Sequence, residues 1–142
     1  MAETALWAEV GLIAKPIANE AKVHYSTIQQ FDFDVAWAAW IADYDDPQNF
    51  LTLLDSRSVV FNYPGYNNPV FDGLMDQAKV ILDIQKRASV LAEAERVMLA
   101  DNAVIPTAFR TAKMLVASYV KGYEENAKST HRTRWMWIDG KP

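Results

Sequence analysis

Two apolar segments in the first third of the chain predict strands. Residues 33–41 are almost continuously apolar and rich in aromatic side chains, which is typical of a strand buried on both faces of an α/β sheet. Residues 12–17 form a second apolar run, in which Pro16 favours an edge position because proline donates no backbone hydrogen bond. The pattern therefore predicts two strands and an α/β fold class.

Apolar residues at helical spacing predict four helices. The first two cover residues 2–9 and 21–30. A third begins after Asn68, a favourable N-cap, with Pro69 at the first helical position. Its apolar stripe comprises Phe71, Leu74, Met75, Ala78, Ile81 and Leu82. Asp83 ends this run, and the fourth helix carries the stripe Val90, Leu91, Ala94, Val97 and Met98.

The charged residues of the fourth helix are expected to face solvent, as such side chains usually do. They are Arg87, Glu93, Glu95 and Arg96. Turn-forming residues concentrate in residues 59–68 and predict an irregular surface loop. After this helix, short apolar runs at 104–109, 114–117 and 135–138 predict strands, while the polar residues 124–130 are expected to be exposed.

An acidic turn follows the first aromatic run. Asp43 lies just past the end of the predicted strand 33–41, and ligands bind beyond the carboxyl ends of strands in open α/β sheets. Asp46 followed by Pro47 predicts a helix start. Asp43 is therefore a candidate contact for a positively charged ligand group. The alternative is a turn residue that only satisfies local amides, since aspartate is common in turns.

Composition narrows the function classes. The chain has 142 residues, of which 51% are hydrophobic and 23% are charged, enough for one compact domain with a core. A net charge of −4 gives no reason to propose a nucleic-acid partner. The absence of cysteine excludes disulfides and thiolate metal sites but leaves the redox compartment open. Neither a signal peptide nor a segment long enough to cross a membrane is expected.

A series of uncommon sequence blocks resembles the C-terminal part of a known family. The blocks are Trp40-Ile-Ala-Asp43-Tyr-Asp-Asp-Pro47-Gln-Asn-Phe-Leu51, Tyr66-Asn-Asn-Pro69-Val-Phe-Asp72, Ala103-Val-Ile-Pro106 and Arg134-Trp-Met-Trp-Ile138. Their order is that of the family 5 bacterial extracellular solute-binding proteins, which are the oligopeptide, dipeptide and nickel receptors of ABC importers. These receptors bind solute between two lobes and deliver it to a membrane permease.

The resemblance implies a C-terminal lobe fragment of a type II-like, two-lobed periplasmic binding protein, with a mixed sheet flanked by helices. Residues 1–103 would belong to the second lobe. Residues 104–142 would form a return segment of strands and loops that crosses toward a first lobe missing from this chain. The protein would work in the periplasm or another extracytoplasmic space, with its export signal outside this chain.

The resemblance also implies the ligand contacts. Asp43 would pair with the α-amino group of a peptide, in a charge-assisted hydrogen bond. Main-chain groups around Ala39, Trp40 and Ile41 would pair with an extended ligand, independently of its side chains. Ala42 and Trp37 complete the candidate ligand-binding set. The Trp40 ring could equally line the pocket or belong to the core.

One position departs from the family pattern. Some oligopeptide-binding relatives carry a basic residue where this chain has Trp37. The far end of a peptide would then be held elsewhere, or the ligand would be a sugar, nickel or another metal complex.

Other kinds of site receive little support from the sequence. The acids Asp43, Asp45 and Asp46 lack the glycine of a calcium loop. His24 and His131 are far apart in sequence and have no cysteine partners, so no metal site is predicted. Neither a nucleophile elbow nor a phosphate loop is present. We predict no enzyme, no cofactor and no metal.

An interaction role is the remaining alternative. The chain could be a stably folded fragment that self-associates without binding ligand. Its apolar tail, with Trp135 and Trp137, should either leave an exposed patch or repack against a second copy in a homodimer.

Overall fold

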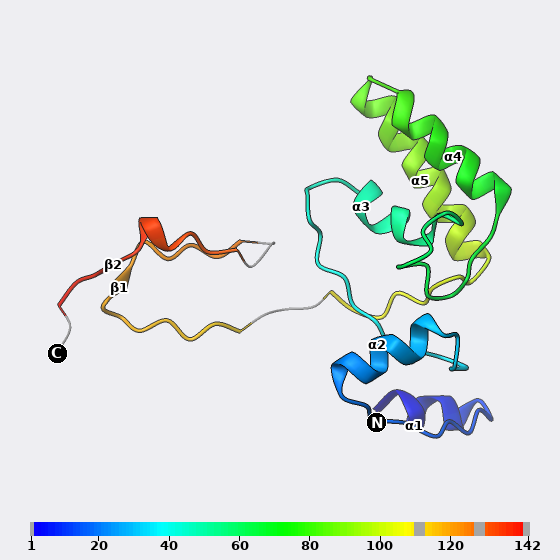
Figure 1. The fold of residues 1–142 in the computed structure, drawn as a ribbon, viewed down its shortest axis with the longest axis horizontal. Helices are drawn as coiled ribbons and strands as arrows, with labels where there is room; N and C mark the ends of the chain where they lie inside the picture. The colour runs from blue at the N-terminus through cyan, green and yellow to red at the C-terminus, as the bar shows by residue number, and fades with distance from the viewer. Residues whose placement is uncertain (1, 110–112, 127–129, 141–142) are drawn as a thin grey trace. The chain divides into compact units, whose positions relative to one another are not determined.

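The computed structural model describes residues 2–109, 113–126 and 130–140. The chain divides into two compact units, Met1–Ala36 and Trp37–Pro142, and each is described by itself (Figure 1). This division does not test the predicted boundary between a lobe, residues 1–103, and a return segment, residues 104–142, which therefore stays a prediction.

The first unit holds two short helices. These are α1 (Ala2–Glu9) and α2 (Ala21–Gln29), which confirm the helices predicted over residues 2–9 and 21–30. The strand predicted over residues 12–17 is wrong, because this segment is irregular and leaves Ile13 98% exposed. A strand needs a neighbour to pair its backbone groups, and the described residues provide none for this segment.

A helical hairpin carries the core of the second unit. It consists of α4 (Pro69–Val80) and α5 (Ile84–Ala100), which lie side by side in Figure 1. The short helix α3 (Gln48–Leu51) continues directly into the 3-10 turn η1 (Thr52–Leu54) and packs against the hairpin. The buried core comprises Leu51, Leu54, Phe71, Met75, Ala78, Leu91, Ala94 and Met98. Both predicted apolar stripes therefore face each other.

Side-chain caps determine where the hairpin helices begin. The Asn68 side chain accepts hydrogen bonds from the backbone N–H groups of Val70 and Phe71, and the Asp83 side chain accepts one from that of Lys86. These caps satisfy N–H groups that have no partner inside the helix. The predicted start at Asn68 and the break at Asp83 are confirmed. Leu82 lies outside the core, 97% exposed, because α4 ends at Val80.

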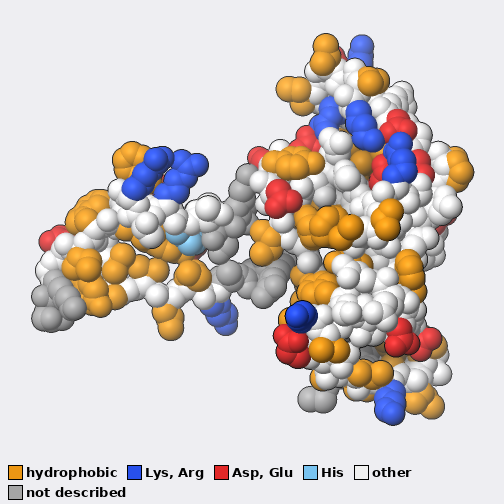
Figure 2. Space-filling model, viewed as in Figure 1, with side chains coloured by type: hydrophobic (Ala, Val, Ile, Leu, Met, Phe, Trp, Pro, Cys, Tyr) orange, Lys and Arg blue, Asp and Glu red, His pale blue; other side chains and the backbone are white. Residues whose placement is uncertain are grey.

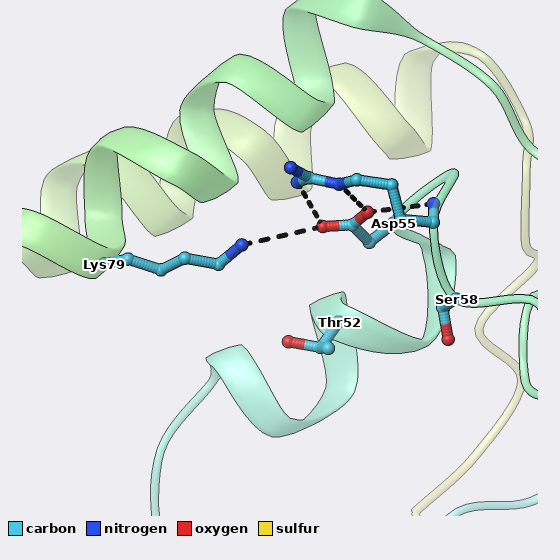
Figure 3. Close-up of a pocket in the computed structure, with 5 residues that line it drawn as sticks. Thr52, Asp55, Ser58 and Lys79 are labelled. Carbon is cyan, nitrogen blue, oxygen red and sulfur yellow. Dashed lines mark hydrogen bonds and ion pairs between the residues drawn. The ribbon is translucent and has the colours of Figure 1, made fainter.

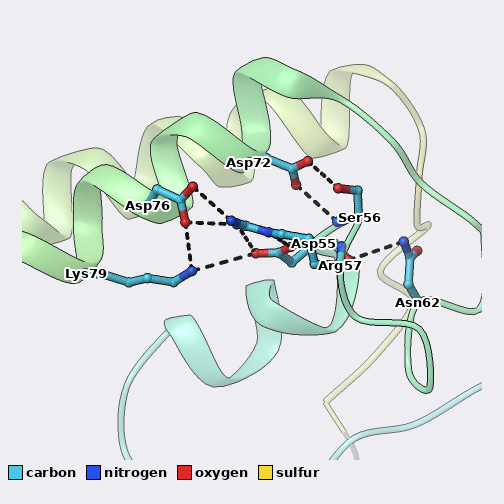
Figure 4. A network of polar contacts seen from close by, with 7 residues as sticks. All are labelled: Asp55, Ser56, Arg57, Asn62, Asp72, Asp76 and Lys79. Atoms are coloured by element: carbon cyan, nitrogen blue, oxygen red, sulfur yellow. Dashed lines mark hydrogen bonds and ion pairs between the residues drawn. The ribbon is translucent and has the colours of Figure 1, made fainter.

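Charged side chains fasten η1 to α4 (Figure 4). The Arg57 guanidinium donates two hydrogen bonds of 2.7 Å to the buried carboxylate of Asp55 and two more, of 2.9 and 3.0 Å, to Asp76. Lys79 also donates to Asp76, at 2.8 Å. Arg57 and then Lys79 lower the pKa of Asp76 to about 2, and Arg57 lowers the pKa of Asp55. Both carboxylates therefore stay charged over the physiological range.

The loop over residues 59–68 is irregular, as predicted. The amide of Asn62 is buried and bridges it, because Nδ2 donates to the Tyr66 carbonyl while Oδ1 accepts from the Tyr66 N–H. The Tyr66 hydroxyl donates to Oδ2 of Asp101 at 2.6 Å, and Asn68 donates to the same oxygen at 2.6 Å. These contacts hold the loop against the end of α5.

The contribution of Tyr66 to the free energy of unfolding should decrease at alkaline pH. Burial and then the bond to Asp101 raise the pKa of Tyr66 to about 12 from an ordinary value of 10.0. A raised pKa in the folded state means that its stabilisation is complete below pH 10 and is lost as the pH rises toward 12. Between these values the unfolding free energy of the wild type should fall more steeply than that of Tyr66→Phe. Denaturant titrations of both proteins from pH 9 to pH 11.5 measure the difference, and parallel curves would contradict it.

Among the residues that the structure describes, strand structure is limited to one short antiparallel pair. Strand β1 (Val120–Lys121) pairs with β2 (Trp137–Ile138), which follows the 3-10 turn η2 (Thr133–Trp135). Of the run predicted over 135–138, the second half is a strand. The strands predicted over 104–109 and 114–117 are wrong, and the described residues contain no mixed sheet. These apolar runs have the composition of strands but no described neighbour to pair with.

The apolar tail is exposed in the single chain, and whether it stays an exposed patch or packs against a second copy remains a prediction. Trp135, Trp137 and Ile138 are each 59% exposed or more, and hydrophobic side chains gather on the C-terminal segment at the left of Figure 2. Arg134 lies over the Trp135 ring, with its guanidinium carbon 4.9 Å from the ring centroid. The predicted homodimer stays a prediction.

The β1–β2 pair should depend on Gly122. This residue has a φ of 74°, and a Cβ atom there would lie 1.9 Å from the Trp135 carbonyl oxygen. Gly122→Ala should therefore disrupt the pair, since the left-handed conformation alone costs a non-glycine residue about 1–2 kcal/mol. Loss of the cross-strand nuclear Overhauser effects between Val120 and Ile138 would show this. Gly73→Ala is a suitable control, because a Cβ atom there meets open space, and retention of these signals in Gly122→Ala would contradict the prediction.

Candidate functional site

The apolar segment over residues 33–41 is not a strand. It is irregular, and Val35, Trp37 and Ile41 are between 53% and 63% exposed. The prediction of a strand buried on both faces is therefore wrong. The run has the composition of a central strand, but the described residues place no other strand beside it, and pairing is what makes such a run a strand.

The end of this segment is held by a buried amide from α3. Asn49 is 6% exposed, and its Oδ1 accepts a hydrogen bond of 2.8 Å from the Trp40 indole N–H and one of 3.1 Å from the Asp43 backbone N–H. Its Nδ2 lies 3.5 Å from Oδ2 of Asp43. The Trp40 ring also packs edge-to-face on Phe61, with ring centroids 5.2 Å apart. Asn49 thus holds both the Trp40 side chain and the backbone of Asp43.

A second contact fixes the turn to the helical hairpin. Arg87 on α5 forms a bidentate pair with Asp46, with distances of 2.5 and 3.0 Å, and also donates to Gln48. The Asp46 side chain accepts a further bond of 2.8 Å from the Gln48 backbone N–H, as predicted for an acid before a helix. The helix begins one residue later than predicted, because Pro47 is its N-cap and not its first residue. This ion pair with Arg87 lowers the pKa of Asp46. The prediction that Arg87 only faces solvent is wrong, because the ion pair holds its side chain against the turn before α3.

The structure distributes the candidate ligand-binding residues unevenly. Asp43, Trp37 and Ile41 are exposed, whereas Ala39, Trp40 and Ala42 are half-buried. Backbone groups of residues 39–41 make no hydrogen bond to another described residue. This short segment therefore offers backbone donors and acceptors beside an exposed carboxylate. Sequence reasoning identified the segment and Asp43 but missed Asn49, because an asparagine inside a short helix carries no pattern that distinguishes an anchor from a surface residue.

Two shallow hollows elsewhere are less suited to bind a ligand. One is lined by Thr52, Asp55, Arg57, Ser58 and Lys79 (Figure 3). Its cations are already paired with Asp55 and Asp76, so a ligand would have to displace those bonds. The other is lined by Arg132, Thr133 and Arg134. The described residues contain no cluster of side chains that could hold a metal ion and no helix long and apolar enough to span a membrane.

Known proteins resemble this chain over nearly its whole length. The periplasmic oligopeptide-binding protein OppA of Escherichia coli is 33% identical over 141 residues, which are 97% of this chain and 26% of OppA. The structure of the murein tripeptide binding protein MppA of Escherichia coli matches with a TM-score of 0.92 and 28% identity, over 99% of this chain and 28% of that protein. The chain is homologous to part of the family 5 solute-binding proteins.

The homology to the family 5 proteins covers a limited part of each relative. The chain spans about a quarter of the length of OppA and MppA. No protein-family model matches the chain. OppA and MppA are periplasmic binding proteins by name, not enzymes. Heme-binding protein A of Haemophilus influenzae is also similar, at 26% identity over 95% of this chain and 25% of that protein. Relatives of this chain are thus named for chemically different ligands.

Proposed function

We propose that the chain is the C-terminal part of a periplasmic receptor that captures short peptides for an ABC importer. The observation that carries this proposal is the segment 39–43, in which the backbone groups of residues 39–41 make no hydrogen bond to another described residue and lead to the exposed side chain of Asp43. The homology to OppA and MppA over almost the whole chain supports it. Asp43 binds the amino terminus of the peptide, and residues 39–41 pair with its backbone.

The chemistry of the segment suits a receptor for many peptide sequences. Backbone pairing gives affinity without reading side chains, and a carboxylate recognises the one charge that every peptide carries at its start. Trp37 and Ile41 are exposed apolar side chains that flank the segment and add contact area. The rest of the receptor supplies the opposite wall of the cleft, its closing motion and the contacts to the membrane permease.

A dedicated non-peptide ligand is the second candidate. Heme-binding protein A shows that relatives of this chain include a protein named for a different solute. Trp37, at the position where some oligopeptide receptors carry a basic residue, favours a ligand that lacks a carboxylate at its far end. Under this alternative, Asp43 would contact another positive or hydrogen-bonding group.

Native mass spectrometry distinguishes these candidates. The protein encoded by the full reading frame that contains this chain should carry a ladder of added masses in the range of short peptides. A single added mass would contradict the peptide proposal and favour a dedicated solute. A protein without added mass that also fails to bind added trialanine would contradict it as well. The 142-residue chain is the control and should bind little, because one side of the cleft supplies only part of the contacts.

A further inference from the structure

The amide of Asn49 connects the two functional ends of the proposed binding segment. Its Oδ1 is shared by the Trp40 indole N–H at 2.8 Å and the Asp43 backbone N–H at 3.1 Å. Both partners are donors, so the oxygen must face them and the Nδ2 group must face the Asp43 carboxylate, 3.5 Å away. The orientation of the amide is therefore determined by its surroundings.

Burial gives this contact its rigidity. Asn49 is 6% exposed and lies on α3 between Gln48 and the core residue Leu51. Gln48 accepts a hydrogen bond from Arg87 of α5. The amide thus lies on a helix that is attached to the hairpin by both apolar packing and a hydrogen bond from Arg87, whereas the segment it holds is irregular. A binding group on a loop needs such support to keep its geometry.

We infer that Asn49 is a positioning residue that sets the place of the Asp43 carboxylate relative to the Trp40 ring and so determines selectivity for ligands with a free amino group. This inference rests on the proposed amine contact of Asp43. Asn49 itself does not touch the ligand. It acts by positioning Asp43, because loss of its amide removes the hydrogen bonds to both the Asp43 backbone N–H and the Trp40 indole N–H. Ligands without an amino group lose little, since they do not use the carboxylate.

The contact can be tested first without ligand. In the 142-residue chain, the Trp40 indole N–H and the Asp43 backbone N–H should both exchange with solvent more slowly than exposed amides do. Trp40→Phe identifies the indole signal among the five tryptophans. In Asn49→Ala both protons should exchange faster. Fast exchange of both protons in the wild type would overturn the inference, whether or not the variant folds.

Selectivity is then measured in the protein from the full reading frame, with trialanine and N-acetyl-trialanine as probes. Asn49→Ala should weaken trialanine binding about two- to tenfold, the range of an ordinary hydrogen bond, and leave N-acetyl-trialanine unchanged. Phe50→Ala is the matched control, because Phe50 lies on the same helix but is 48% exposed; this variant should leave the affinity for both probes unchanged. Equal losses for both probes would show a merely structural role and overturn the inference. If Asp43→Asn also fails to discriminate between the probes, the proposed amine contact fails instead.

Discussion

Leu91→Ala is expected to lower the free energy of unfolding of the second unit by about 2–5 kcal/mol, the range for truncating a buried leucine. Leu91 is 2% exposed and belongs to the cluster that joins α5 to α4 and α3. Its removal leaves a cavity between elements that are already fixed by capping and ion pairs, so the site cannot fully collapse. Denaturant unfolding followed by the helical circular dichroism signal measures the loss.

Ile84→Ala supplies the comparison for this core position. Ile84 begins the same helix but is 79% exposed, so its truncation should change stability by less than about 1 kcal/mol. Similar effects at both positions would mean that the helical hairpin is not held by the packing at Leu91. An intact stability of Leu91→Ala would also contradict the assignment of this face to the core.

The helical hairpin was predictable because its determinants are local. The caps Asn68 and Asp83 lie directly before the helices that they start, and both apolar stripes repeat within a single element. Helix backbone groups pair inside the element, so a correct local pattern is enough to specify it. The error at Leu82 has the same origin, because apolar spacing does not reveal where the backbone leaves the helix.

The strands were less predictable because a strand needs a partner. Residues 12–17 and 33–41 have apolar runs typical of strands, yet neither pairs with a described neighbour. The β1–β2 contact joins Val120 to Ile138, and β1 was not foreseen because its two residues form no apolar run. Composition identifies segments that fit a sheet, but a strand forms only where a partner segment, often distant in sequence, pairs with its backbone.

The candidate site shows the same division. Asp43 and the adjoining backbone could be proposed as candidates from their position at the end of an apolar run. Asn49 and Arg87 could not, because their roles depend on contacts across the fold: the amide reaches back to Trp40, and the guanidinium reaches Asp46 from α5. Such anchors become visible only when the elements that carry them are placed together.

Asp43→Asn is expected to weaken binding of ligands with a free amine by about 1.5–3 kcal/mol, the range for a hydrogen bond to a charged group. The substitution keeps the size of the side chain and leaves the backbone N–H bonded to Asn49 unchanged. The substitution removes the negative charge that we propose to contact the ammonium group, so N-acetylated ligands should bind as before. Isothermal titration of the protein from the full reading frame with trialanine and N-acetyl-trialanine measures the two losses separately.

Asp45→Asn is the matched control, because it removes the same charge two residues further along the exposed turn. If general electrostatic attraction held the ammonium group, both variants would weaken trialanine binding to a similar degree. A loss confined to Asp43→Asn requires a directed contact with that carboxylate. Losses in Asp43→Asn that are equal for the amine and the N-acetylated ligand would contradict the amine contact, since the acid would then act only through the shape of the turn.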